Sequence, residues 1–245
     1  MDRPRKILRL SGTDTETFLQ GLITNDLEKM DDGLLYAAIL TPQGKYLADF
    51  FLCRAHDAIL MDVDAEQAPS LMQRLNMYKL RADVTIEDPA LNLHRGLSDT
   101  PADGFADPRA DGLGWRAYRD APQTDDQTDW PAHYVAHQIP MSGVELTGDS
   151  YILENGFERL NGVDFRKGCY VGQEVTARMK HKTELRKGLA LLSIDGEAPV
   201  GSEITRDGRT VGTLFTQANG QALAYLRFDR AGDGMQAGNA TLQMP

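Results

Sequence analysis

One cysteine of this chain lies among residues that could activate a thiol. Cys169 falls between two glycines in "FRKGCYVGQEVTARMKHK", residues 165–182. The glycines predict a tight turn into a helix that begins near Gln173, and the N-terminal end of a helix carries positive potential. Lys167 and Arg178 would add positive charge, and such surroundings lower the pKa of a cysteine. We therefore predict that Cys169 is an accessible, activated thiol and not an inert one.

The other cysteine and the histidines offer less chemistry. Cys53 lies in the apolar segment "DFFLCRA", which is typical of a buried, inert thiol. Two cysteines cannot form a tetrathiolate site or a disulfide framework, so we predict no metal. His181 lies beyond the predicted helix, too far along the chain to pair with Cys169. His133 and His137 are four residues apart but lack the glutamate of a zinc-protease helix, which favours a structural role.

Positive charge is concentrated around Cys169 in an otherwise acidic protein. Residues 166–187, the basic segment, hold seven lysines and arginines against two glutamates, whereas the whole chain has a formal net charge of −10. A local positive region in an acidic protein indicates a specific anion site, and the alternative is a solvated basic helix. The negative total disfavours binding to nucleic acid or to an anionic membrane surface.

Asp49 is a second candidate for chemistry. It lies in "KYLADFFL", a predicted strand in which strict alternation gives it the same face as Leu47 and Phe51. A carboxylate on the apolar face of a strand must be partnered or functional. The alternative, a carboxylate at a strand end that faces water, stays open from the sequence alone.

The elements that must position these residues begin with an α+β region. The pattern of apolar residues and turns predicts the order β-α-β-β-β-α-β, which indicates antiparallel strands. Thr13 and Glu16 have the spacing of a capping box at the start of the first helix. Residues 99–130 carry eight aspartates against three arginines, and we expect them to form a long solvated connection around one short strand.

The C-terminal quarter of the chain has the pattern of hairpins. Asp-Gly and Asn-Gly pairs at 207–208 and 219–220 separate alternating segments, and such pairs favour tight hairpin turns. Several short strands joined in this way predict a small β-barrel or sandwich. A boundary near Thr183 then divides the chain into domains 1–183 and 184–245.

The whole sequence also indicates where the protein works. No basic N-terminal segment is followed by an apolar run of the signal-peptide type. No stretch approaches the roughly 18 consecutive apolar residues of a membrane span. We therefore expect a cytoplasmic protein with no membrane partner.

The segment "KGCYVGQEVTAR" (167–178) resembles the signature of the YgfZ family of folate-binding proteins, whose mitochondrial members are the Iba-type iron–sulfur assembly factors. The likeness extends over most of the chain. The further segments occur in the family's order: "FLQGLITNDL", "TPQGKYLADFFL", "YKLRADVTIED", "IPMSGVEL", "ILENGFERLNGVDFRKGCY" and "ALAYLRFD".

The resemblance implies a fold and a function. The fold would be that of the glycine-cleavage T-protein, an α+β folate-binding domain in two parts with antiparallel sheets and a small C-terminal β-barrel. The protein would bind tetrahydrofolate and support assembly or repair of iron–sulfur clusters in radical-SAM enzymes, including tRNA-modifying ones. Its partners would be folate and iron–sulfur proteins.

The resemblance also implies roles for particular residues. Cys169 matches the family's functional cysteine, and Asp49 falls where the T-protein keeps the carboxylate beside the reactive folate nitrogen. The folate-binding residues implied by the rest of the signature are Lys167, Tyr170, Gln173, Glu174 and Arg178. Folate carries carboxylates and a flat pterin, which suit a positive segment beside an apolar channel.

Two other functions stay open. The first is a folate-dependent one-carbon transferase, of aminomethyl or methyl groups, in which Asp49 positions the substrate. The chain lacks the Tyr-Thr-Gly-Glu segment of T-protein relatives, which argues against aminomethyl transfer. The second is a protein-interaction module that has lost its folate channel. The sequence does not decide whether the protein is an enzyme.

Overall fold

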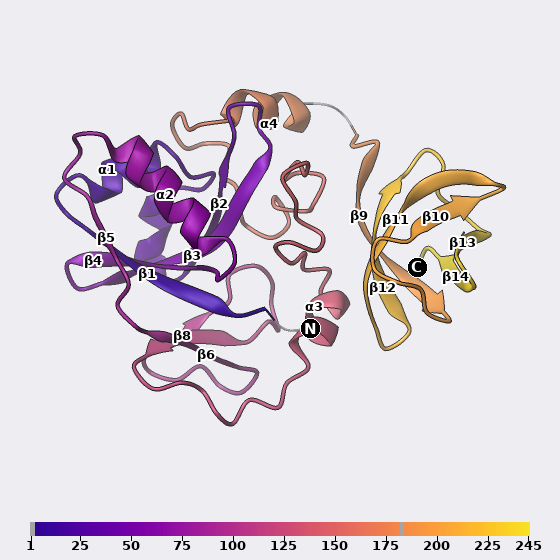
Figure 1. Ribbon diagram of the computed structural model, residues 1–245, viewed down its shortest axis with the longest axis horizontal. Helices are drawn as coiled ribbons and strands as arrows, with labels where there is room; N and C mark the ends of the chain where they lie inside the picture. Colours follow the sequence, from indigo (N-terminus) through magenta and orange to yellow (C-terminus); the bar gives the residue numbers. More distant parts are fainter. Residues whose placement is uncertain (1–2, 182–183) are drawn as a thin grey trace. The chain divides into compact units, whose positions relative to one another are not determined.

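The structure is a computed structural model that describes residues 3–181 and 184–245 (Figure 1). The described residues form two compact units. The N-terminal unit comprises Arg3–Thr128 and Phe157–Ala177. The barrel unit comprises Asp129–Gly156 and Arg178–Pro245.

The domain boundary predicted near Thr183 lies outside the described residues. The division into 1–183 and 184–245 therefore stays a prediction. Within the part of the chain that the structure describes, no helix is both long and apolar enough to cross a membrane.

A five-stranded antiparallel sheet forms the centre of the N-terminal unit, in the order β2-β3-β4-β1-β5 (Figure 1). Its strands are β1 (Arg5–Ser11), β2 (Leu35–Leu40), β3 (Tyr46–Ala55), β4 (Ala58–Asp64) and β5 (Thr85–Glu87). Every residue of β2 and β4 is buried, so this sheet is covered on both faces. The helical elements of the same region are α1 (Thr15–Gln20), the 3-10 helix η1 (Leu27–Asp32) and α2 (Ala68–Lys79). The predicted order β-α-β-β-β-α-β is confirmed.

Helix α1 begins differently from the prediction. Its N-cap residue, Asp14, makes no capping hydrogen bond through its side chain. The Thr13 hydroxyl donates instead to Asp83 Oδ2 at 2.9 Å, and Glu16 forms an ion pair with Arg54. The predicted capping box is therefore wrong, because both of its side chains are engaged with residues far away in the sequence.

The acidic stretch 99–130 belongs to a second, three-stranded sheet with the order β6-β8-β7. Its strands are β6 (Asn92–Gly96), β7 (Phe105–Ala106) and β8 (Trp115–Arg119). The short strand expected within this stretch is confirmed as β8. The expectation of a solvated connection is wrong for its central part, since Asp107, Arg109 and Arg116 are all buried.

These buried charges form a compensated network against the main sheet. Arg109 Nη2 lies 2.8 Å from Asp107 Oδ2, and Arg116 Nη1 lies 2.9 Å from Asp62 Oδ2. The Arg116 guanidinium also stacks 3.9 Å from the centroid of the Phe51 ring. Burial opposes ionisation of Asp107, but its two arginine neighbours outweigh that effect and hold its pKa at about 2. Part of the acidic stretch is thus interior structure.

The barrel unit contains a closed barrel with the strand order β10-β11-β12-β9-β14-β13 (Figure 1). Its strands are β9 (Lys187–Asp195), β10 (Glu203–Arg206), β11 (Arg209–Ala218), β12 (Gln221–Arg227), β13 (Met235–Ala237) and β14 (Ala240–Gln243). Both predicted tight turns are present, with φ of 52° and 71° at 207–208 and of 52° and 74° at 219–220. These positive φ values are the ones that Asp-Gly and Asn-Gly pairs adopt readily.

A buried glutamate connects the barrel to the segment Asp129–Gly156, which contains helix α3 (Trp130–Ala136). Glu145 Oε1 accepts hydrogen bonds from the Thr216 amide at 3.1 Å and from its hydroxyl at 2.6 Å. Glu145 Oε2 accepts from the Met141 amide at 2.9 Å. Burial raises the pKa of Glu145, although these donors favour the charged form. The segment is therefore part of the barrel unit through specific polar contacts.

Candidate functional site

Cys169 lies on an exposed turn that leads into helix α4 (Gln173–Lys180). Both cysteines are free, and Cys53 is buried in β3. Burial raises the pKa of Cys53 to about 12, with a smaller contribution from the charge of Asp62. Cys53 is therefore inert near neutral pH, as predicted, and Cys169 has the predicted exposure. Its chemical role stays a prediction.

Gly172 explains how the chain enters helix α4. Its φ is +86°, and a Cβ added there would lie 2.6 Å from the Thr41 carbonyl oxygen and 2.9 Å from Leu40 Cβ. A second close approach faces it, because a Cβ on Gly44 would lie 2.8 Å from Val175 Cβ. Only glycine combines this backbone conformation with this proximity. The first turn of α4 is thus packed against the turn between β2 and β3.

Lys167, two residues before the thiol, is a buried anchor. Its Nζ donates hydrogen bonds to the backbone carbonyls of Gln20 at 2.8 Å, Ile23 at 2.7 Å and Asn25 at 3.0 Å. An ammonium group has three N–H donors, so these bonds use its full capacity. Burial lowers the pKa of Lys167 to about 8, against the attraction of two nearby aspartates. The predicted folate contact of Lys167 is therefore corrected, because its donors are directed at the protein backbone.

Further contacts, which the sequence did not predict, hold the same turn. Asp164 accepts hydrogen bonds from the amides of Arg166 at 2.6 Å and Lys167 at 3.2 Å. Its other oxygen pairs with Lys29 Nζ at 2.6 Å. An aspartate that accepts from amides two and three residues later is a recurrent turn pattern. The segment "DFRK" (164–167), an aspartate followed by these residues, could therefore have predicted this turn from the sequence.

The other predicted folate contacts divide between the interior and the surface. Tyr170 is buried, its ring centroid lies 5.1 Å from Lys167 Nζ, and burial raises its pKa. Gln173 begins α4 and is half-buried. Its backbone amide donates a hydrogen bond to the Tyr170 carbonyl at 3.2 Å. Glu174 and Arg178 are exposed in the first and last turns of α4, an arrangement that complements the helix dipole.

Asp49 is buried in β3 and is partnered. Its Oδ2 accepts a hydrogen bond from the Tyr36 hydroxyl at 3.0 Å, and its Oδ1 accepts one from the Tyr46 hydroxyl at 2.5 Å. Burial and the Asp49 charge raise the pKa of Tyr36 well above its ordinary value. Of the possibilities left open by the sequence, the water-facing carboxylate is excluded. Asp49 is only 4% exposed.

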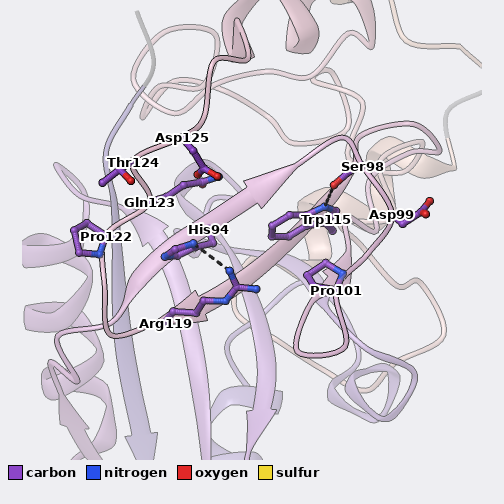
Figure 2. A pocket seen from close by; sticks show the side chains of 10 residues that line it. All are labelled: His94, Ser98, Asp99, Pro101, Trp115, Arg119, Pro122, Gln123, Thr124 and Asp125. Atoms are coloured by element: carbon purple, nitrogen blue, oxygen red, sulfur yellow. Dashed lines mark hydrogen bonds between the residues drawn. The ribbon is translucent and has the colours of Figure 1, made fainter.

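A pocket of about 470 Å³ lies over the three-stranded sheet (Figure 2). Figure 2 shows His94 directed at Arg119, with 3.3 Å between His94 Nδ1 and Arg119 Nη1. Arg119 is also paired with Asp103 through two hydrogen bonds of 2.8 Å. Gln123, which also lines the pocket, exchanges hydrogen bonds with the Arg95 backbone. These polar groups satisfy one another, and none of the predicted site residues lines the pocket.

Within residues 3–181 and 184–245, no group of three or more histidine, cysteine or acidic side chains could hold a metal ion. His133 and His137, the pair noted in the sequence, lie at helix α3 with ring centroids 4.4 Å apart and ring planes tilted by 53°. A ring nitrogen of His137 also lies 2.9 Å from the His133 carbonyl oxygen. The pair makes local contacts within the barrel unit.

The chain is similar to known proteins along most of its length. The family model "CAF17, C-terminal beta-barrel domain" matches residues 186–245. The mitochondrial iron–sulfur cluster assembly factor IBA57 of Mus musculus is 30% identical over 271 residues, which cover 94% of this chain and 73% of that protein. The Homo sapiens protein of the same name is 30% identical, and the match covers 91% of this chain and 75% of that protein.

The fungal relatives are longer. The IBA57 homologue of Mycosarcoma maydis is 32% identical over 222 residues, which cover 77% of this chain and 55% of that protein. The homologue of Neurospora crassa is 30% identical, and 55% of it is covered. The chain thus spans about half the length of these two relatives. The relatives are named as mitochondrial proteins, which contradicts the cytoplasmic location expected from the sequence and points to the mitochondrion.

A solved structure confirms the fold. The glycine cleavage system aminomethyltransferase T from Bartonella henselae superposes with a TM-score of 0.77, covering 97% of this chain and 81% of that chain at 12% identity. The predicted T-protein-like architecture, with antiparallel sheets and a C-terminal β-barrel, is therefore correct. At such low identity the likeness establishes the fold alone. The identity and coverage of the mammalian relatives lead to one conclusion: the chain belongs to the IBA57 family of iron–sulfur cluster assembly factors.

Proposed function

We propose that this protein supports the assembly or repair of iron–sulfur clusters in client proteins, and that Cys169 is the residue that meets the client. The observation that carries the proposal is an exposed thiol on a turn anchored from beneath by Lys167. Its relatives are named iron–sulfur cluster assembly factors. In this proposal the cluster is delivered to the client and is not a resident cofactor of this protein. Thiolates bind such clusters, and a single exposed thiol contributes one sulfur contact to a cluster that the client otherwise holds.

The anchored turn gives the thiol a defined position. Lys167 fixes the backbone two residues before Cys169, and the close approach at Gly172 fixes it three residues after. A reactive group held from both sides loses little conformational entropy when it meets a partner. This arrangement supports a role in which the thiol engages a client in one geometry.

Tetrahydrofolate binding is the second part of the proposal. The predicted contacts that remain outside the interior are Gln173, Glu174 and Arg178, all on α4. The Arg178 guanidinium suits the carboxylates of folate, and the Gln173 amide suits a ring that both donates and accepts hydrogen bonds. Folate, when bound, would supply a carrier for one-carbon units. Lys167 and Tyr170 are buried in the turn before α4 and would not touch the ligand.

The clients we propose are radical-SAM enzymes, including those that modify tRNA, as the resemblance to the YgfZ family implies. Complementation of a deletion strain tests this. Cys169→Ser should fail to restore the activity of such an enzyme, whereas the matched Cys53→Ala variant should restore it. Full rescue by Cys169→Ser would remove the thiol from the proposal.

Calorimetry with tetrahydrofolate tests the folate part separately. Wild-type protein should bind with one-site stoichiometry, and Arg178→Met should bind at least about fivefold more weakly, the loss expected for one charge-assisted contact. The absence of binding to wild-type protein would refute this part and would favour a protein-interaction module.

A folate-dependent one-carbon transferase is the second candidate. One observation favours it: Asp49 is a buried carboxylate on the main sheet. Both of its oxygens accept tyrosine hydroxyls, which gives it a structural role independent of any substrate. Assays with aminomethyl, N-methyl and formyl donors compare wild type with Asp49→Asn. Turnover that depends on Asp49 would support the transferase, and no turnover with any donor would dismiss it.

A further inference from the structure

A second polar site lies within the barrel unit, at the hairpin between β10 and β11. A pocket of about 570 Å³ is lined by Arg206, Asp207, Arg209, Val211 and Arg230. This lining holds three arginines and one aspartate, so its net charge is positive in a protein whose formal net charge is −10. Positive charge gathered in a hollow of an acidic protein attracts anions.

Arg206 is held in place by the loop that follows β12. Its Nη1 donates to the carbonyls of Arg230 at 3.2 Å and Ala231 at 3.1 Å. The guanidinium also packs on the backbone of Gly232, where an added Cβ would lie 2.7 Å from Nη1. The orientation of this side chain is therefore set before any ligand arrives, and a preset donor binds with a smaller entropic loss.

One donor of Arg206 is left unsatisfied. Its Nε is buried and has no hydrogen-bond partner among the residues that the structure describes. The carboxylate of Asp207 lies 3.9 Å away, beyond hydrogen-bond distance. Buried donors in native proteins nearly always have an acceptor, supplied by protein, water or ligand. The Nε of Arg206 therefore lacks a hydrogen-bond acceptor among the described residues.

The other two arginines leave charge available to the same pocket. Arg209 is exposed, and its side chain makes no hydrogen bond or ion pair with any described residue, although its backbone pairs with Arg206 in the β10–β11 ladder. Arg230 forms an ion pair with Asp229, with 3.9 Å between Nε and Oδ2, a distance too long for a hydrogen bond. Three like charges that converge on one hollow repel one another, and a multivalent anion between them removes that repulsion.

We propose that this pocket binds a multivalent oxyanion, a phosphate or polycarboxylate group of a small molecule, with Arg206 as its fixed anchor. The guanidinium of Arg206 keeps its full positive charge, and oxyanions accept strong charge-assisted hydrogen bonds from such a group. Arg209 and Arg230 add the remaining charge. The volume lies in the range of small-molecule sites, roughly 300–1,000 Å³. This site is separate from the proposed function of Cys169 and does not rest on it.

Calorimetry on the full chain tests the proposal, with pyrophosphate and citrate as separate probes at constant ionic strength. At least one probe should bind with one-site saturation. Arg206→Met should weaken that binding at least about tenfold and Arg209→Met several-fold, as expected for lost charge-assisted contacts. Asp207→Asn removes the only carboxylate of the lining and should tighten binding. Asparagine tolerates the positive φ of 52° at this position.

Arg81→Met is the matched control, since Arg81 is exposed, lies outside the pocket and undergoes the same change of charge. It should leave binding unchanged. Binding of pyrophosphate alone assigns a phosphate ligand, binding of citrate alone assigns a carboxylate ligand, and binding of both assigns recognition by charge. Saturation by neither probe would overturn the proposal. An equal loss of affinity in Arg81→Met and Arg209→Met would also overturn it. So would unchanged affinity in both Arg209→Met and Asp207→Asn. These last outcomes can be read even if the Arg206→Met variant fails to fold.

Discussion

Replacement of Lys167 by methionine tests the buried anchor beneath the Cys169 turn. Methionine keeps a long apolar side chain but has no N–H donor, so the three carbonyl oxygens lose the bonds that Nζ now provides. Each hydrogen bond from a charged donor contributes about 1.5–3 kcal/mol, which gives roughly 5–9 kcal/mol for three. The variant no longer buries an ammonium group, and that relief offsets several kcal/mol. We expect a net loss of about 3 kcal/mol in the free energy of unfolding.

Thermal unfolding at pH 7, followed by calorimetry, measures this loss. For a chain of this size, about 3 kcal/mol corresponds to a fall of roughly 6–12 °C in the Tm of the transition that includes the N-terminal unit. At this pH the side chain is mostly charged, because its pKa is about 8. The measurement therefore reports the charged anchor.

Lys29→Met is the matched control for the same substitution. Lys29 pairs with Asp164 at 2.6 Å, but its side chain is 48% exposed. A solvent-screened pair of this kind contributes about 1 kcal/mol or less, so the control should lower Tm by no more than about 4 °C. Equal Tm values for the two variants would show that the bonds of Lys167 add nothing beyond a surface ion pair, and the anchor would be refuted.

Three further predictions follow from the geometry. Iodoacetamide should alkylate Cys169 in the native protein but Cys53 only after denaturation, because Cys53 is buried and its pKa is raised to about 12; native labelling of both would contradict this, as read by mass spectrometry. Gly172→Ala should lower the free energy of unfolding in urea by at least about 2 kcal/mol, since its Cβ would lie 2.6 Å from the Thr41 carbonyl oxygen; wild-type stability would show that the turn relaxes freely. Asp107 has a folded-state pKa of about 2 against an ordinary value of 3.8, so it contributes about 2 kcal/mol that is present above about pH 4 and lost as the pH falls toward 2. Asp107→Asn should therefore show a shallower loss of stability over that acid range, and an unchanged slope would mean that the ion pairs of Asp107 contribute nothing.

Local sequence signals predicted the hairpins and the order of elements well. The Asp-Gly and Asn-Gly turns of the barrel depend on backbone preferences of two adjacent residues, and both are found where they were expected. The start of α4 at Gln173 likewise follows from the glycine that precedes it. Such features are determined by neighbours in the sequence, which is why a single sequence is enough to predict them.

The partners of buried charges could not be predicted in the same way. The residue that accepts the shortest bond from Lys167, Ile23, is 144 positions away in the sequence. Asp62 and Arg116 are 54 positions apart. Residue type alone identifies Lys167, Asp62 and Arg116 as charged, and charged residues are usually expected at the surface. Only the fold shows that these groups are interior and that each is compensated.

The two positive regions of the protein illustrate why charge must be judged in space. The basic segment 166–187 is rich in cations in the sequence. Lys167, however, donates its hydrogen bonds to backbone carbonyls, and Lys182 lies outside the described residues. The arginines of the barrel pocket are separated by up to 24 positions and formed no visible pattern in the sequence. They nevertheless converge on one hollow that has an unsatisfied donor at Arg206. An anion responds to the potential at one point in space. If anion binding to this chain depends on the barrel arginines, charge density along a sequence is a poorer guide to anion sites than the convergence of preset donors.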